Sequence, residues 1–126
     1  MTAEIECAGC ITKPATIEVR ASYNARDGVI GFGIGARYKS RTGDTVSACL
    51  YETELTPIQA HRLACCIREL ADGNVGDFYE AGLEFTAGEY SGCEIALPHC
   101  YVWIAEDTDV YELAEALDKA AKEAGA

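Results

Sequence analysis

Apolar and polar residues alternate along three segments in the first half of the chain, with the period of two that marks a half-buried β-strand. Residues rich in Asn, Asp and Gly separate these segments at 24–28 and 41–44, as expected of hairpin turns. The pattern therefore predicts an antiparallel meander of three strands at residues 16–23, 29–39 and 45–51.

Each predicted strand of the meander presents one apolar face. Ile17 belongs to this face in the first strand, and Val46, Ala48 and Leu50 form it in the third. We expect these side chains to point toward the core. Residues 1–14 are predicted to form an irregular N-terminal lead-in.

Start and stop signals frame a helix after the meander. Thr56 stands in the N-cap position, Pro57 at N1, and Gln59 at N3 completes a capping box. Apolar residues then recur at helical spacing as far as Ala71, and Gly73 is a candidate C′ residue. The pattern predicts one well-delimited helix in this region.

The second half of the chain is less regular. A final helix is predicted to begin at residues 108–109, where Asp109 and Glu112 have the spacing of a capping pair. Between the two helices the sequence offers two weak strand candidates and one clearer strand. These are Gly82–Ala87, Cys93–Leu97 and Tyr101–Ala105, in that order.

These elements predict a single α+β domain over residues 1–126. Its antiparallel β-sheet is expected to consist of the three-stranded N-terminal meander plus one to three later strands, with two main helices packed on one face. No secretory signal is visible at the N-terminus, and the apolar runs are shorter than the roughly 20 residues of a membrane span. We therefore expect a cytoplasmic protein, in the host cell's cytoplasm if a phage encodes it.

The net charge of −11 is divided unevenly along the chain. Residues 1–69 hold eight acidic and eight basic side chains, which cancel. Residues 70–126 hold thirteen acidic side chains and only two lysines, so the whole net charge originates there. An acidic surface repels nucleic acid and anionic membranes and attracts basic proteins, so we expect neither nucleic acid nor membrane as a direct partner.

Three alternating glycines leave part of one face of the second predicted strand without side chains, and Arg37 and Lys39 continue this face. Alternating glycines indicate a close approach, either by a packed helix or bulge, or by a planar or anionic ligand. Nearby arginines suit phosphate because the guanidinium fork is planar and bidentate. On the second interpretation the ligand-binding residues are Arg20, Gly31, Gly33, Gly35, Arg37, Tyr38, Lys39 and Arg41, with Tyr23 and Tyr51 also available to stack on a base.

Seven cysteines are present, an odd number, and without a secretory signal a disulfide framework is not expected. A weak alternative is a structural zinc held by the Cys7–Cys10 pair together with Cys93 and Cys100. His99 adjoins Cys100, which hinders both from binding one ion. Otherwise we expect no metal and no cofactor.

A run of acidic residues surrounds the start of the last predicted helix. Some of them are expected to cap the helix and complement its dipole, on a solvated face. The functional interpretation is that the run imitates a phosphate backbone and binds a basic nucleic-acid-binding protein. The candidate partner-binding residues are Glu106, Asp107, Asp109, Glu112, Glu115 and Asp118.

The order of three antiparallel strands, a helix, a strand and a helix resembles the first part of the ribonuclease H-like fold. The matching stretches are Ile17–Tyr38, Thr56–Leu70 and Ile104–Thr108, the last resembling that family's strand that ends in Asp and a small hydroxyl residue. The family places a metal-binding Asp in the first strand, where this chain has residues 21–23, and a Glu early in the first helix, near His61. The resemblance implies that a two-metal nuclease activity has been lost.

No arrangement for nucleophilic catalysis with known spacing is visible in the sequence, and His61 is interpreted as a partly exposed helix residue. We therefore expect a non-enzymatic protein that binds a small anionic ligand of the nucleotide type as a homo-oligomer. Its size and charge are typical of phage or mobile-element counter-defence proteins that sequester nucleotide signals. The alternatives are an acidic-surface inhibitor of a nucleic-acid-binding complex, and a catalytically inactive ribonuclease H-like or zinc-stabilised domain.

Overall fold

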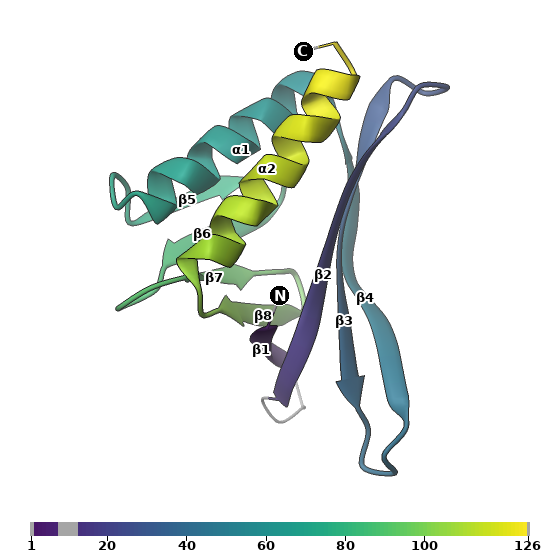
Figure 1. Ribbon diagram of the computed structural model, residues 1–126, viewed down its shortest axis with the longest axis vertical. Helices are drawn as coiled ribbons and strands as arrows, with labels where there is room; N and C mark the ends of the chain where they lie inside the picture. The colour runs from purple at the N-terminus through teal and green to yellow at the C-terminus, as the bar shows by residue number, and fades with distance from the viewer. Residues whose placement is uncertain (1, 8–12, 126) are drawn as a thin grey trace.

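The computed structural model, which describes residues 2–7 and 13–125, contains eight strands and two helices. In chain order these are β1 (Thr2–Cys7), β2 (Lys13–Asn24), β3 (Val29–Lys39), β4 (Thr45–Leu55), α1 (Pro57–Ala71), β5 (Asp77–Glu80), β6 (Leu83–Ala87), β7 (Cys93–Ala96), β8 (Cys100–Ile104) and α2 (Asp107–Glu123). The strands form one antiparallel sheet in the order β4-β3-β2-β1-β8-β7-β6-β5. The sheet curves as a half-barrel, and the two helices lie side by side against its concave face (Figure 1).

The expected sheet of a three-stranded meander plus one to three later strands is wrong, because four strands precede α1 and four follow it. The predicted lead-in at residues 1–14 contains β1, which joins the two halves of the sheet by pairing with β2 and β8. Ala3 and Ile5 of β1 are buried, whereas Glu4 and Glu6 are exposed. This alternation is real but spans too few residues to stand out in the sequence.

The second half of the sheet contains one strand more than its sequence indicated. β5 pairs with β6 through a tight turn at Ala81 and Gly82, both of which have positive φ. The Phe78 and Phe85 rings stack across this pair with their centroids 4.6 Å apart. The other three strands of this half occupy the predicted segments, with ends that differ by at most one residue.

The order of elements that suggested a ribonuclease H-like fold is not the order of this chain. That resemblance rested on three strands, a helix, a strand and a helix. The structure instead repeats four strands and a helix twice. Neither of the two described helices is long and apolar enough to span a bilayer.

The start of α1 agrees with its sequence signals, whereas the start of α2 does not. Thr56 accepts a hydrogen bond from the Gln59 backbone N–H (3.1 Å), and the Gln59 side chain accepts one from the Thr56 N–H (2.9 Å). α2 begins at Asp107, and its N-cap residue Glu106 makes no side-chain capping bond, so the predicted capping pair at the start of this helix is wrong. The Asp107 carboxylate instead accepts a hydrogen bond from the Gly92 backbone N–H (2.7 Å) and ties α2 to the start of β7.

The helices run antiparallel to each other, because His61 contacts Asp118 near one end of the pair and Asp72 contacts Tyr111 near the other. Their buried faces and the concave face of the sheet form one hydrophobic core. No polar or charged side chain is buried among the described residues. The core therefore extends under both halves of the sheet without interruption.

A β-bulge interrupts the pairing of β3 with β4 between Ile34 and Gly35. Leu50 is the extra residue, and it packs against the core as predicted. Beyond the bulge the alternation of β4 is shifted by one, so that Tyr51 also faces inward, opposite Ile34. The Tyr51 hydroxyl donates a hydrogen bond to the Ala81 carbonyl oxygen (2.6 Å), which links edge strand β4 to the β5–β6 turn.

Candidate functional site

A groove of about 500 Å³ runs along the convex face of β2, β3 and β4, on the side of the sheet opposite the helices. Backbone and side chains from all three strands line it. We call it the glycine groove, and its lining residues are Glu18, Arg20, Ser22, Gly31, Phe32, Gly33, Ile34, Gly35, Ala36, Arg37, Ser47, Ala48, Cys49 and Glu52.

The register of the three strands builds the glycine groove as a floor between two walls. Each glycine of β3 lies between one residue of β2 and one of β4, so the walls stand two strand spacings apart, roughly 10 Å. This width accepts a flat ring or a phosphate group but not a helix. The three rows across the strands are Ser22–Gly31–Glu54, Arg20–Gly33–Glu52 and Glu18–Gly35–Cys49, and all of these residues except Glu54 line the groove.

Within residues 2–7 and 13–125, no element packs on the glycine floor. A methyl group added at Gly33 would lie 3.6 Å from the nearest atom, the Tyr51 carbonyl oxygen, which is an ordinary contact. At Gly31 the nearest atom, the Ser22 carbonyl oxygen, would be 3.9 Å away. Of the two structural explanations for the glycines, helix packing is wrong because both helices lie on the other face, whereas a bulge does occur at Gly35.

The charged side chains of the glycine groove are of both signs. Glu18 forms ion pairs with Arg37 (2.9 Å) and Arg20 (3.5 Å), and Glu52 stands on the opposite wall. The Arg37 and Arg20 side chains are 56% and 81% exposed, so each pair contributes at most about 1 kcal/mol to stability. An incoming anion can therefore replace Glu18 as the partner of these arginines at little cost.

The predicted ligand residues do not all meet at this groove. Tyr38 faces the opposite side of the sheet, where it packs against the hydrophobic core. Tyr23 and Tyr51 share that inward face and are not available to stack on a base there. Lys39 and Arg41 lie beyond the groove, toward the β3–β4 turn. The structure brings together Arg20, Gly31, Gly33, Gly35 and Arg37.

The convex face of β1 and β5–β8 has a different character, which the sequence did not reveal. These five strands contain no Lys or Arg. Trp103 lies opposite Glu4 on one side and Glu94 on the other, and its ring stacks on that of Tyr101 with centroids 6.0 Å apart. We call this surface the acidic face, and its residues are Glu4, Glu6, Asp77, Tyr79, Glu84, Glu94, Tyr101 and Trp103.

The predicted acidic run around the start of α2 is partly engaged within the protein. Asp107 holds the Gly92 N–H, and Asp118 contacts His61 and Arg68. Partial burial raises the pKa of Asp118, but the hydrogen bonds and charges of Arg68 and His61 outweigh this and hold it below the ordinary value. Glu106, Glu112 and Glu115 are exposed, whereas Asp109 is half-buried.

The predicted zinc ligands do not assemble into one site among the residues described. Cys93 lies opposite Ile104, four residues along β8 from Cys100, which corresponds to roughly 13 Å. Burial raises the pKa of the Cys93 thiol to about 12, which disfavours the thiolate that zinc requires. Cys10 lies outside the described residues, and only the backbone of Cys7 is described. No group of three or more His, Cys, Asp or Glu in the described ranges is placed to hold a metal ion.

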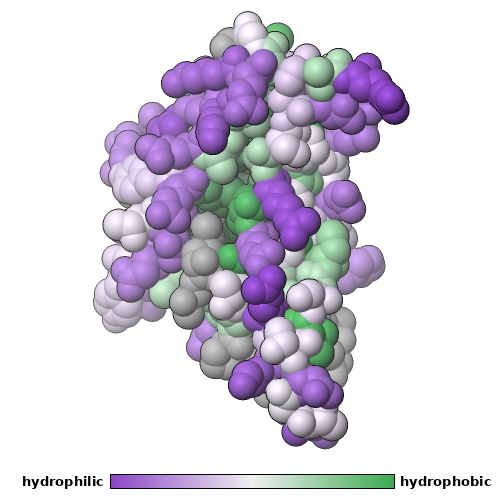
Figure 2. Space-filling view, turned by 45° about the vertical axis from the view of Figure 1, so that its right-hand side comes forward, coloured by the Kyte–Doolittle hydropathy of each residue, from purple (hydrophilic) through white to green (hydrophobic). Residues whose placement is uncertain are grey.

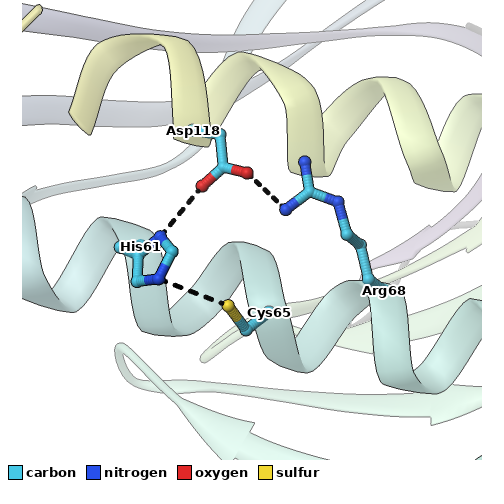
Figure 3. A network of polar contacts seen from close by, with 4 residues as sticks. All are labelled: His61, Cys65, Arg68 and Asp118. Atoms are coloured by element: carbon cyan, nitrogen blue, oxygen red, sulfur yellow. Dashed lines mark hydrogen bonds and ion pairs between the residues drawn. The ribbon is translucent and has the colours of Figure 1, made fainter. Parts of the chain in front are cut away.

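A network of side chains connects the two helices and was not predicted from the sequence (Figure 3). Asp118 of α2 contacts Arg68 and also His61 Nδ1 (3.2 Å), and His61 Nε2 lies 3.6 Å from the Cys65 sulfur. The spacing of His61 and Cys65, one helical turn apart, was the available signal. Asp118 is more than fifty residues away in sequence, so only the packing of the helices identifies it as their partner.

Hydrophobic surface is confined to small patches between hydrophilic side chains on the side of the molecule that Figure 2 presents. The glycine groove, which holds two arginines, and the acidic face, whose strands hold no Lys or Arg, differ in composition. Comparisons with protein-family models, curated proteins and solved structures find no match to this chain.

Proposed function

We propose that this protein is a non-enzymatic binding protein that holds a small anionic ligand of the nucleotide type in the glycine groove and thereby sequesters it. The observation that carries the proposal is the bare floor of the groove, on which no other part of the described chain packs. Three glycines in a strand cost stability, since each lacks a packed side chain. A flat ligand lying on the exposed backbone offsets this cost.

The two walls suit the two ends of a nucleotide. Arg20 and Arg37 offer guanidinium groups to a phosphate, and both exchange Glu18 for it on binding. Across the floor, Glu52 is an acceptor for amino or hydroxyl groups of the base or sugar. The base itself lies flat against the glycine backbone in this arrangement.

The glycine groove is open to solvent along its length, so a single chain covers only one side of a ligand. A second copy of the chain over the groove would enclose the ligand, and we therefore propose that the binding form is a homo-oligomer. Sequestration of a nucleotide signal by such an assembly agrees with a counter-defence role in a phage or mobile element, for which small size and negative charge are the supporting features.

The Gly33→Val variant tests the proposal by filling the floor. Valine suits a strand, and its Cβ meets only an ordinary contact at this position, so the thermal midpoint should stay the same or rise. Ligand affinity should fall at least about tenfold, because the side chain occupies the space of the ligand. Gly76→Val is the matched control, since a Cβ added at Gly76 meets nothing within 4 Å and Gly76 lies in the α1–β5 connection, outside the lining of the groove.

Calorimetric titration with nucleoside monophosphates and cyclic dinucleotides provides the readout. The proposal expects at least one of these ligands to bind the natural protein and Gly76→Val with equal affinity, and Gly33→Val more weakly. Equal binding by all three proteins would show that the ligand binds outside the glycine groove. Failure of every ligand to bind would exclude nucleotides as the ligand class of this protein.

A second candidate function is supported by the acidic face. Trp103 between Glu4 and Glu94 offers an aromatic ring with a carboxylate on each side, a combination that suits an arginine side chain. We propose, as this alternative, that the acidic face binds a basic surface of a nucleic-acid-binding protein. Such binding should weaken steeply with salt and should not change in Gly33→Val, which separates the two functions.

A further inference from the structure

Cys65 lies in a chain of polar contacts that begins at Arg68 and passes through Asp118 and His61 (Figure 3). Asp118 uses one carboxylate oxygen for Arg68 and the other for His61 Nδ1, at 3.2 Å. The remaining ring nitrogen of His61, Nε2, lies 3.6 Å from the Cys65 sulfur. The three side chains that follow Arg68 thus stand in the order carboxylate, imidazole and thiol.

The order of these groups determines which atom can accept the proton of the Cys65 thiol. A hydrogen bond from Nδ1–H to Asp118 leaves Nε2 without a hydrogen, so that it can accept the proton of the thiol. The imidazolium formed in this way is stabilised by the adjacent carboxylate. Arg68 keeps that carboxylate ionised by occupying its second oxygen.

The position of Cys65 within α1 restricts the reactions that this thiol can perform. Backbone N–H groups in the interior of a helix donate to carbonyl groups four residues earlier, so none is available to stabilise an oxyanion beside the sulfur. Such donors strongly accelerate acyl transfer. Thiol–disulfide exchange does not depend on such donors, because its negative charge is carried by the thiolate that leaves.

We propose that Cys65 is a reactive thiol that undergoes exchange with small-molecule disulfides. In the step, His61 Nε2 takes the thiol proton as the Cys65 sulfur attacks one sulfur of the disulfide. The disulfide bond breaks, a bond forms between Cys65 and one half of the molecule, and the other half leaves as a thiolate that receives the proton from His61. The step needs no further oxidant or reductant. It is independent of ligand binding in the glycine groove, which lies on the opposite face of the sheet.

Two other cysteines of the chain provide internal references. Cys49 is exposed like Cys65, but its sulfur lies 3.7 Å from the Tyr51 carbonyl oxygen instead of beside an imidazole. Cys66 is next to Cys65 but half-buried, and burial together with Glu80 raises the pKa of its thiol. The comparison of Cys65 with Cys49 therefore separates the effect of His61 from that of exposure alone.

The experiment measures mixed-disulfide formation with oxidised glutathione at pH 7, by intact mass and peptide mapping. Cys66→Ala serves as the background, because Cys65 and Cys66 fall in the same peptide. We expect Cys65 to react about tenfold faster than Cys49, because only Cys65 has a base beside its sulfur. In His61→Asn the rate at Cys65 should fall to that at Cys49, while the rate at Cys49 stays constant. His99→Asn makes the same substitution at an exposed histidine in the β7–β8 connection, so it is the matched control and should leave both rates unchanged.

Asp118 acts through His61 and is a positioning residue in this proposal. Asp118→Asn should lower the rate at Cys65 only, and Asp118→Glu should restore part of it, whereas a purely structural role would affect the helix content measured by circular dichroism in both variants. Equal rates at Cys65 and Cys49 in the natural sequence would overturn the proposal. An unchanged Cys65 rate in His61→Asn would overturn it as well.

Discussion

The two halves of the sheet are alike on the concave face and different on the convex face. Toward the helices, Phe32 and Ile34 of β3 are buried as completely as Phe85 of β6 and Val102 of β8. Toward solvent, β2–β4 present the glycine groove with its two arginines, whereas β1 and β5–β8 present the acidic face without any Lys or Arg. Folding requires the concave face to be apolar in both halves, but it places no such demand on the convex face.

The two proposed functions both rest on this difference between the convex faces. The acidic residues are also divided differently over the surface of the protein than along its sequence. β1 comes from the neutral half of the chain, yet Glu4 and Glu6 belong to the acidic face because β1 pairs with β8. The boundary between the two surfaces runs between β1 and β2.

The largest expected effect tests whether the two halves share one core. Phe32→Ala in β3 and Phe85→Ala in β6 should each lower the free energy of unfolding by about 3–5 kcal/mol, because each leaves a cavity under a fully buried ring. Denaturant unfolding of both variants should follow a single transition. A second transition in either variant would show that the halves fold as separate units, and the comparison of their surfaces would lose its basis.

The next effect separates the glycine groove from the acidic face. Arg37→Ala should weaken binding of a nucleotide-type ligand by about 1.5–3 kcal/mol, the usual contribution of a charge-assisted hydrogen bond. The thermal midpoint should hardly change, because the ion pair with Glu18 is exposed. Arg26→Ala, in the β2–β3 turn, is the control for loss of positive charge outside the groove. Equal losses of affinity and stability in Arg37→Ala would indicate a structural role for this arginine.

A smaller effect is expected on the acidic face. Glu94→Gln should weaken binding of an arginine-rich peptide by up to about 1 kcal/mol at low salt, and Trp103→Ala should do so through the lost aromatic ring. Glu112→Gln removes the same charge from the exposed side of α2 and should have no effect. If Glu94→Gln and Glu112→Gln weaken peptide binding equally, the peptide responds to the net charge of the protein and not to the acidic face.

The smallest effect concerns the helix layer, which both halves share. Because the folded-state pKa of Asp118 lies below its unfolded value, its charge stabilises the fold above the unfolded pKa. This contribution disappears as the pH falls through the folded-state pKa. Asp118→Asn should therefore lower stability by up to about 1 kcal/mol at pH 7 and make little difference in strong acid. Thermal melts of both proteins between pH 7 and strong acid provide the check. If Asp118→Asn is still less stable than the natural protein in acid, the loss of stability comes from packing and not from charge.

The parts of the fold that the sequence predicts are those in which several local signals agree. β2 and β3 combine long alternation with a turn of Asn, Asp and Gly, and α1 combines a capping box with helical periodicity. β1 was missed because its alternation covers few residues. The shift of β4 at the bulge was missed because it depends on pairing with β3 and leaves no mark in the sequence.

The candidate surfaces differ in the same way. The floor of the glycine groove was predictable because all three glycines belong to one strand, and the same alternation already placed Tyr38 on the opposite side. The acidic face is assembled from five short strands, so its members become neighbours only through the register. The Cys65 network depends on the packing of two helices, which sequence periodicity alone does not determine.

Native mass spectrometry of the natural protein and of Gly33→Val, each as purified, tests the central claim most directly. The glycine-groove account predicts an oligomer of the natural protein that carries extra mass of the size of a nucleotide, and the same measurement should find Gly33→Val without that mass. A natural protein that is monomeric and remains without bound mass after incubation with the nucleotide panel would contradict the account.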